Sequence, residues 1–280
     1  MKHRLSTSHR GNTHRLVRPR DGIIVLPDLG SVYVQVRGMG GGLGKAVESL
    51  RPISIEGLEF AFDPDAGIGF SITTLEAIHV EAPHATSYFE GSLAFKFRGF
   101  PHGLGIHLLP GGENRRRWQI ADLLATVPTE SLADGELEQW RGERRSTVPM
   151  CPCCRDRAKE RSRHPESHPL HSILQHAAAG GITLHWRFSD AHADLSAAFV
   201  PARIEAREGF LIVSDAPAHH AAHLEMARLH ALAIQTKTLD GFDYARIQLF
   251  EPRGRTTFEI LAEDPALAPL WRRFCERPAN

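Results

Sequence analysis

The chain has 280 residues, of which 42% are hydrophobic and 24% charged, and its formal net charge is zero. This composition is typical of a globular protein with one large domain or two smaller ones, and it excludes a chain too polar to fold. Balanced charge provides no field that would attract nucleic acid, and no apolar run reaches the roughly 20 residues that a membrane-spanning helix needs. No apolar secretory core follows the basic N-terminus, and four cysteines do not suggest a secreted disulfide framework. We therefore expect a cytoplasmic protein without a membrane or nucleic-acid partner.

The first half of the chain reads as a succession of short strands. Residues 1–20 are basic and aperiodic, which predicts a disordered tail, and alternating runs then begin with SVYVQV at 31–36. The glycine-rich stretch 37–47 lacks the ending of a phosphate loop, so we interpret it as a flexible loop or bulge. Helical spacing at 113–127 closes this half. Strands joined by short turns predict a large antiparallel sheet with flanking helices.

The second half follows a charged, proline-containing linker, which we place at residues 128–168. It begins with an alanine-rich helix at 171–181, and strands follow it. Residues 218–226 favour a short helix or loop. The clearest hairpin turns at 251–254, and a helix closes the chain.

The two halves share a pattern at one offset, which indicates an internal repeat. Glu56-Gly57-Leu58 lies 152 positions before Glu208-Gly209-Phe210, and SVYVQV falls on TLHWRF at the same offset. Trp118 and Trp271 match within one residue of it. We predict an α+β protein of two tandem repeats, at residues 21–127 and 169–280, each a large antiparallel sheet with flanking helices.

The order of motifs in the second half resembles that of a known family. The residues that carry the resemblance are Asp215, His223-Leu224, Lys237-Thr238, Asp240-Gly241, Leu249-Phe250, Gly254 and Trp271. They are similar to the C-terminal half of the HemS/ChuS family, bacterial cytoplasmic proteins that traffic or degrade haem. The match covers about residues 170–275, and residues 22–125 only by strand order. That family is itself built from two repeats, each a large antiparallel sheet with flanking helices.

The resemblance implies haem as the ligand and carriage as the favoured role, with haem cleavage as the alternative activity and a haem donor or acceptor protein as partner. In the family a histidine ahead of the second repeat holds the iron, and an arginine of the first repeat opposes it. His168 and His171 occupy the histidine's place, whereas LEFAF at 58–62 has Glu59 where the arginine is expected. The resemblance further implies that His223 lines the pocket. Lys237 and Arg246 are candidates to pair with the propionates.

The linker holds a second set of candidate ligands among the chain's 17 histidines and four cysteines. Cys151, Cys153, Cys154 and His164 offer the thiolates and imidazole that zinc prefers, which leaves a zinc-braced binding module without haem as the alternative function. Cys151-Pro152 is also a Cys-Pro pair of the kind that contacts haem, with the thiolate as an axial ligand. The sequence leaves zinc, haem and a merely solvated linker open.

Overall fold

The computed structural model describes residues 13–54, 60–81, 89, 91–98, 100–110, 129–131 and 150–276. The helix expected at 113–127, Trp118, Glu59 and the motif at 56–58 lie outside these residues. No helix in the described part of the chain is long and apolar enough to cross a membrane.

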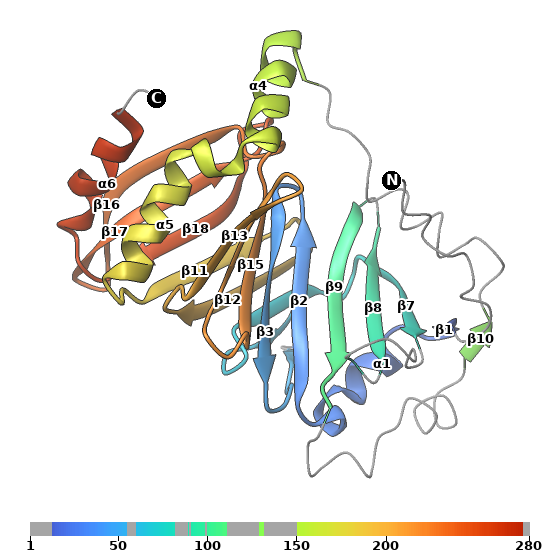
Figure 1. Ribbon diagram of the computed structural model, residues 1–280. Helices are drawn as coiled ribbons and strands as arrows, with labels where there is room; N and C mark the ends of the chain where they lie inside the picture. Colours follow the sequence, from blue (N-terminus) through green and yellow to red (C-terminus); the bar gives the residue numbers. More distant parts are fainter. Residues whose placement is uncertain are drawn as a thin grey trace.

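The described strands form two large antiparallel sheets (Figure 1). The ten-stranded sheet, sheet A, has the order β10 (Thr129–Ser131), β1 (Thr13–Leu16), β7 (Leu75–Glu81), β8 (Ser92–Phe97), β9 (Phe100–Leu108), β2 (Val32–Gly38), β3 (Gly41–Val47), β15 (His220–Glu225), β14 (Phe210–Ser214) and β13 (Arg203–Arg207). The eight-stranded sheet, sheet B, has the order β16 (Ala231–Leu239), β17 (Phe242–Phe250), β18 (Thr256–Ala262), β11 (Leu184–Ser189), β12 (Ala193–Phe199), β6 (Ile68–Ser71), β5 (Phe60–Asp63) and β4 (Ile53–Ser54).

The strand orders confirm the internal repeat and show that the two halves exchange strands. The series β7-β8-β9-β2-β3 of sheet A corresponds to β16-β17-β18-β11-β12 of sheet B, and β2 and β11 begin 152 positions apart, at Val32 and Leu184. Each series is then extended by three strands of the other half, β15-β14-β13 and β6-β5-β4. The predicted α+β class is confirmed, but each large sheet is built from both repeats.

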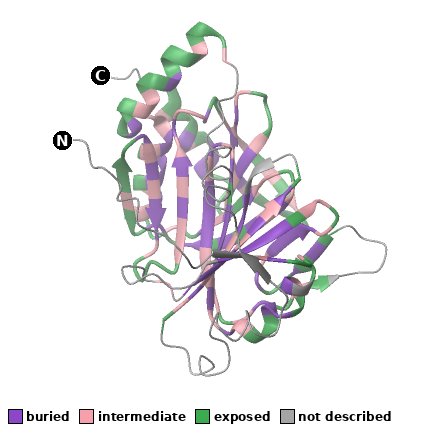
Figure 2. Ribbon diagram, turned by 90° about the vertical axis from the view of Figure 1, so that its right-hand side faces the viewer, coloured by how far each residue is buried: buried purple, intermediate pink, exposed green. Residues whose placement is uncertain are grey.

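The core lies between the sheets and under the helices of the second half. Strands β2 and β3 contact β11 and β12, and alternate residues of β11, β12 and, apart from Gln35, of β2 are buried. Buried residues run along the strands of both sheets in Figure 2. Fully buried side chains on the two central strands are Val32, Val34, Val36, Leu184, Trp186 and Phe188. This period-2 burial is the reason that the strand predictions in both halves succeeded.

Helices follow local capping signals. The described helical segments are α1 (Asp21–Ile24), η1 (Leu26–Leu29), α4 (Pro152–Arg163), η3 (Pro165–Ser167), α5 (Pro169–Ala179) and α6 (Leu267–Glu276). Proline occupies the first turn of α4 and α5, where its missing N–H costs nothing, and α5 ends at the glycine pair predicted to stop it. Helix α6 contacts α5, β16 and β17 and buries Trp271 completely.

Several segments differ from the prediction. Residues 41–47 are strand β3, not a loop, and residues 220–225 are strand β15, so the loop and helix interpretations of these two segments were wrong. The two strands pair with each other, with Ala222 opposite Leu43. Within the linker, residues 152–163 form helix α4, and residues 13–16, assigned to the tail, form strand β1 at one side of sheet A. The hairpin at 251–254 is confirmed between β17 and β18.

Candidate functional site at the start of the second repeat

The end of α4 packs onto sheet A through a partly buried arginine. The Arg161 Nε donates a hydrogen bond of 3.1 Å to the carbonyl oxygen of Met226, the residue after β15. Its Nη2 is buried and has no hydrogen-bond partner among the described residues, and burial lowers the pKa of Arg161. A buried N–H donor of a guanidinium without a partner is costly unless an anion or water satisfies it. Arg161 therefore marks a place where an anionic group would be stabilised.

His168 lies next to this arginine as the N-cap of α5. Its Nδ1 accepts a hydrogen bond of 3.2 Å from the backbone N–H of Leu170. Burial, and then the charge of Arg161, lowers the pKa of His168 to about 4, so the imidazole is neutral at neutral pH. Because Nδ1 accepts, Nε2 carries the ring proton. His168 can bind a metal through Nε2 only if the cap hydrogen bond is released.

No N-cap hydrogen bond of this kind is recorded at His171 among the described residues. His171 is half-buried in the first turn of α5, and its charge is one of the influences that lower the pKa of Glu166, after the hydrogen bond to the glutamate's own backbone. Glu166 also lies 3.3 Å from the Nδ1 of His164. Metal-binding histidines commonly donate their second ring N–H to a carboxylate. His171 therefore has a carboxylate within electrostatic reach that could orient its ring.

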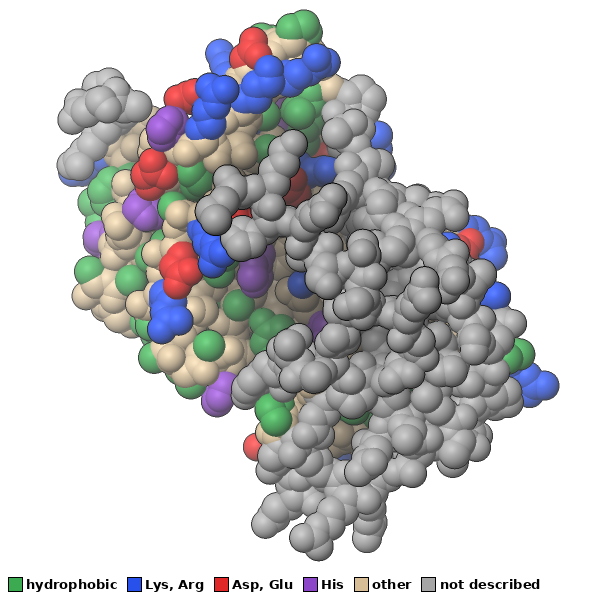
Figure 3. Space-filling view, turned by 45° about the vertical axis from the view of Figure 1, so that its right-hand side comes forward, with side chains coloured by type: hydrophobic (Ala, Val, Ile, Leu, Met, Phe, Trp, Pro, Cys, Tyr) green, Lys and Arg blue, Asp and Glu red, His purple; other side chains and the backbone are tan. Residues whose placement is uncertain are grey.

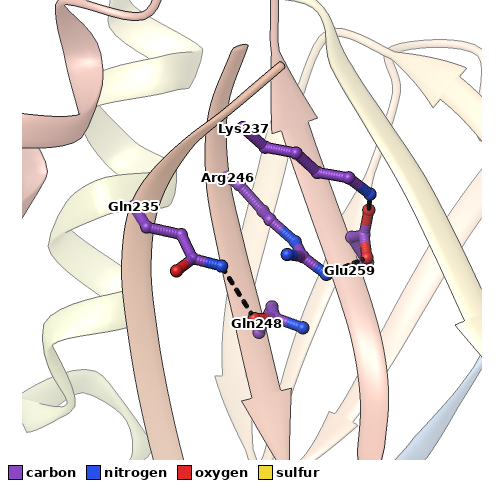
Figure 4. Close-up of polar contacts among 5 residues, drawn as sticks. All are labelled: Gln235, Lys237, Arg246, Gln248 and Glu259. Atoms are coloured by element: carbon purple, nitrogen blue, oxygen red, sulfur yellow. Dashed lines mark hydrogen bonds and ion pairs between the residues drawn. The ribbon is translucent and has the colours of Figure 1, made fainter. Parts of the chain in front are cut away.

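The predicted propionate-binding cations lie together on the face of sheet B that points away from the core (Figure 4). Lys237 and Arg246 each donate to Glu259, at 2.7 Å in both cases. Desolvation raises the pKa of Glu259, but the two hydrogen bonds outweigh it and lower the pKa below its ordinary value. Beside them Gln235 donates to Gln248 at 3.1 Å. The cluster therefore carries one net positive charge.

His223 lies on the other sheet. It projects from β15 on the face of sheet A away from the core, opposite Gly42, and burial and then the charge of Arg37 lower its pKa. Arg37 in turn donates from Nε to the Oε1 of Gln35 at 2.8 Å. No hydrogen bond or ion pair between described residues links His223 to Lys237 or Arg246. The predicted haem-site residues thus lie in four places: His168 and His171 at the start of α5, Lys237 and Arg246 on sheet B, His223 on sheet A, and Cys151 at the start of α4.

The three linker cysteines come together at the start of α4, whereas His164 does not join them. Their sulfur atoms all lie within 4.8 Å of one another, and the Sγ atoms of Cys151 and Cys153 are 3.0 Å apart. Hydrogen bonds from Cys153 and then Cys154 lower the pKa of Cys151 to about 7. Hydrogen bonding with Cys151 raises the pKa of Cys154 to about 11. Cys151 caps the N-terminus of α4 and His164 its C-terminus, so the whole 12-residue helix, about 18 Å long, separates them.

Sequence reasoning missed two of these residues. Arg161 was one of many linker charges, and only its burial against Met226 distinguishes it. Glu259 was part of an alternating strand, and its role depends on the register that places Arg246 and Glu259 on the same face of β17 and β18. The sequence did offer one signal for Glu259: it is an acidic residue on a predicted strand, and the neighbouring predicted strand carries the basic residue Arg246.

Comparison with solved structures identifies the fold. The chain superposes on the apo form of PhuS, a heme-binding protein from Pseudomonas aeruginosa, with a TM-score of 0.66 and 12% identity, over 95% of this chain and 86% of that one. It superposes on ChuS, an E. coli heme oxygenase, with a TM-score of 0.63 and 12% identity, over 95% of this chain and 88% of that one. No protein-family model matches the sequence, and no curated protein matches it. The chain therefore has the two-repeat fold of the HemS/ChuS proteins, as the resemblance in its second half predicted.

Proposed function

We propose that this protein binds haem and carries it in the cytoplasm. The observation that supports this most is the likeness to heme-binding PhuS and to the heme oxygenase ChuS across nearly the whole chain. The junction between α4 and α5 supplies candidate groups for haem, because the described residues there place His168 and His171 near the partly buried Arg161. Function depends on such a site and not on the fold alone.

The residues of the junction fit haem through His171. An axial ligand must present an unprotonated ring nitrogen, which the cap hydrogen bond prevents at His168 and nothing described prevents at His171. Glu166 would accept the second ring N–H of His171 and orient the ring toward the iron. We therefore assign the iron to His171 and the capping of α5 to His168.

The propionates of haem are anionic and require cationic partners. Arg161 offers the unpaired buried donor, and the Lys237–Arg246–Glu259 cluster offers a net positive charge on sheet B. Charge-assisted hydrogen bonds from arginine are the stronger of these interactions. We propose Arg161 as the principal propionate partner, with Lys237 and Arg246 as further candidates.

Carriage is the activity that these residues support directly. A carrier needs one iron ligand and groups that recognise the propionates, and it must pass haem to or from another protein. Cleavage would in addition require an electron donor, for which no residue is assigned.

An absorption titration of the full apo-protein with hemin tests the proposal. Wild-type protein should give a saturable one-to-one spectrum with a sharp Soret band. His171→Ala should abolish or shift that band, while His168→Asn, which keeps an N-cap, and the exposed control His230→Ala should leave it in place. No saturable spectrum in the wild type would refute haem binding. Loss of the band in His168→Asn alone would refute the assignment of the ligand.

A further inference from the structure

The most concentrated chemistry outside the proposed haem site is the group of three thiols at the start of α4, which we call the thiol cluster (Cys151, Cys153 and Cys154). It is the one group of three or more metal-ligating side chains found among the described residues. Cys151 and Cys153 are exposed and Cys154 is half-buried. Nothing in the proposed haem function uses Cys153 or Cys154.

The distances suit a common centre. Two sulfurs bound to one cation at about 2.3 Å each lie about 4 Å apart in a trigonal arrangement. All three sulfur atoms lie within 4.8 Å of one another, and the pair Cys151–Cys153, now 3.0 Å apart, would have to open by about 1 Å to reach this spacing. Rotation about the side-chain bonds of exposed cysteines can supply such shifts without moving the helix.

The start of α4 offers positive charge to bound thiolates. Cys151 is the N-cap of α4, and its sulfur accepts the backbone N–H of Cys154 at 3.4 Å. A helix N-terminus stabilises negative charge, and Arg155 and Arg157 follow in the first turns of α4. Arg155 is held beside the cluster by donating to the carbonyl oxygen of Met150 at 3.4 Å. Figure 3 shows Lys and Arg side chains gathered at the end of the molecule formed by α4.

The number of ligands decides the kind of cation. A structural zinc site is four-coordinate, and the described residues bring no fourth His, Asp or Glu to the three sulfurs. His164, at the far end of α4, cannot supply it. Soft thiolate ligands select Cu(I), which three sulfurs satisfy without a fourth donor.

We propose that the thiol cluster is an exchangeable, three-thiolate site for a soft monovalent cation of the Cu(I) class. Its exposure at a helix end, where it braces no core, allows ligand exchange with a donor or acceptor thiol. Three thiolates around one monovalent cation leave two negative charges, which Arg155 and Arg157 offset. The site is independent of the haem proposal, because neither its ligands nor its test involves His171.

A competition titration tests the site. The full chain, reduced with a phosphine under argon and shown to have four free thiols, is titrated against a chromophoric Cu(I) chelator. The wild type should remove one Cu(I) per chain from the chelator. Cys151→Ser, Cys153→Ser and Cys154→Ser should each weaken binding by about tenfold or more, or about 1.4 kcal/mol. Cys275→Ser, the matched control on α6, should bind as the wild type does.

Other results would overturn the proposal. A reduced wild type that leaves the chelator's absorbance unchanged would show that the cluster does not bind Cu(I). Equal affinity in Cys153→Ser and Cys275→Ser would place the metal elsewhere. Stoichiometric Zn²⁺ that Cu(I) fails to displace would overturn the choice of cation. Because Cys151 and Cys153 are exposed, their serine variants should keep the wild-type circular dichroism spectrum, which separates loss of the site from loss of the fold.

Discussion

Gly41 of β3 lies directly against the backbone carbonyl of His223 in β15, at the seam where the first repeat pairs with the second. A Cβ at Gly41 would overlap that carbonyl oxygen, and the backbone there has a φ of +141°, which L side chains rarely adopt. The exchange of strands between the repeats therefore depends on a residue without a side chain.

Replacing Gly41 should disrupt this seam. We expect Gly41→Ala to lower the free energy of unfolding by about 3 kcal/mol or more, since β3 and β15 cannot approach and the backbone is strained. Gly254→Ala is the matched control, because Gly254 has a φ of +81° but no atom within 4 Å of its Cβ position. It should cost about 1 kcal/mol. Urea unfolding of the two variants gives the comparison, and equal costs would refute the role of the seam.

The same seam explains which strands the sequence could not predict. Strand β3 begins with glycines because Arg37 and Tyr33 of β2 cross the positions of Gly42 and Gly44, so Leu43 is the one side chain among its first four residues. Strand β15 reads HAAHLE, whose alanines favour a helix. Its strand conformation comes from pairing with β3, far away in the chain, and such tertiary pairing overrides local propensity. Strands such as β2 and β11 were predictable because their alternation faces a core.

The sequence did not predict helix α4, because this helix has almost no buried apolar face. It buries little apolar surface, Ala158 being its fully buried residue, so it lacks the amphipathic spacing that reveals a helix. Its N-terminus nevertheless carried a local signal, with Pro152 in the first turn behind a capping residue. The cysteines were identified from the sequence as possible ligands, but only the helix shows that His164 lies beyond their reach.

The buried His168 should make the stability of the protein depend on pH. The pKa of His168 is lowered from 6.5 to about 4 in the folded state, so the unfolded chain takes up the proton first as the pH falls. The contribution of neutral His168 to the free energy of unfolding is complete above pH 6.5 and declines as the pH falls. It is lost below about pH 4, a change of up to about 3 kcal/mol. His168→Asn keeps a capping side chain and removes the titration. Chemical unfolding from pH 7 to 4 should show a shallower decline in this variant, and parallel declines would contradict the assignment.

Glu259 should contribute more to the free energy of unfolding than a carboxylate on a solvent-facing strand usually does. Its carboxylate holds Lys237 and Arg246, all three side chains being largely shielded from solvent. Glu259→Gln leaves two neighbouring cations without their partner, and we expect a loss of about 2 kcal/mol at pH 7. Because the pKa of Glu259 is lowered, the wild type loses this contribution as the pH falls below about 4.5, through the folded-state value.

The control for this change is Glu263→Gln, just after the end of the same strand, where the carboxylate is 76% exposed beside His185. It should cost no more than about 0.5 kcal/mol. Thermal unfolding at pH 7 and pH 4 measures both variants. If Lys237 and Arg246 also pair with propionates, Glu259→Gln should tighten hemin binding while it lowers stability, a combination that general unfolding would not produce.

Arg161 should act on His168 through charge and on haem through its unpaired donor. Burial is the larger cause of the low pKa of His168 and the guanidinium the smaller, so Arg161→Met should raise that pKa only part of the way toward its ordinary value. The same variant should weaken hemin binding, since it removes the proposed propionate partner. Arg163→Met, an exposed change in the same turn of α4, should alter neither quantity. NMR titration of the His168 ring and a hemin titration measure the two effects. A fall in the pKa of His168 in Arg161→Met would contradict the electrostatic coupling of the two side chains.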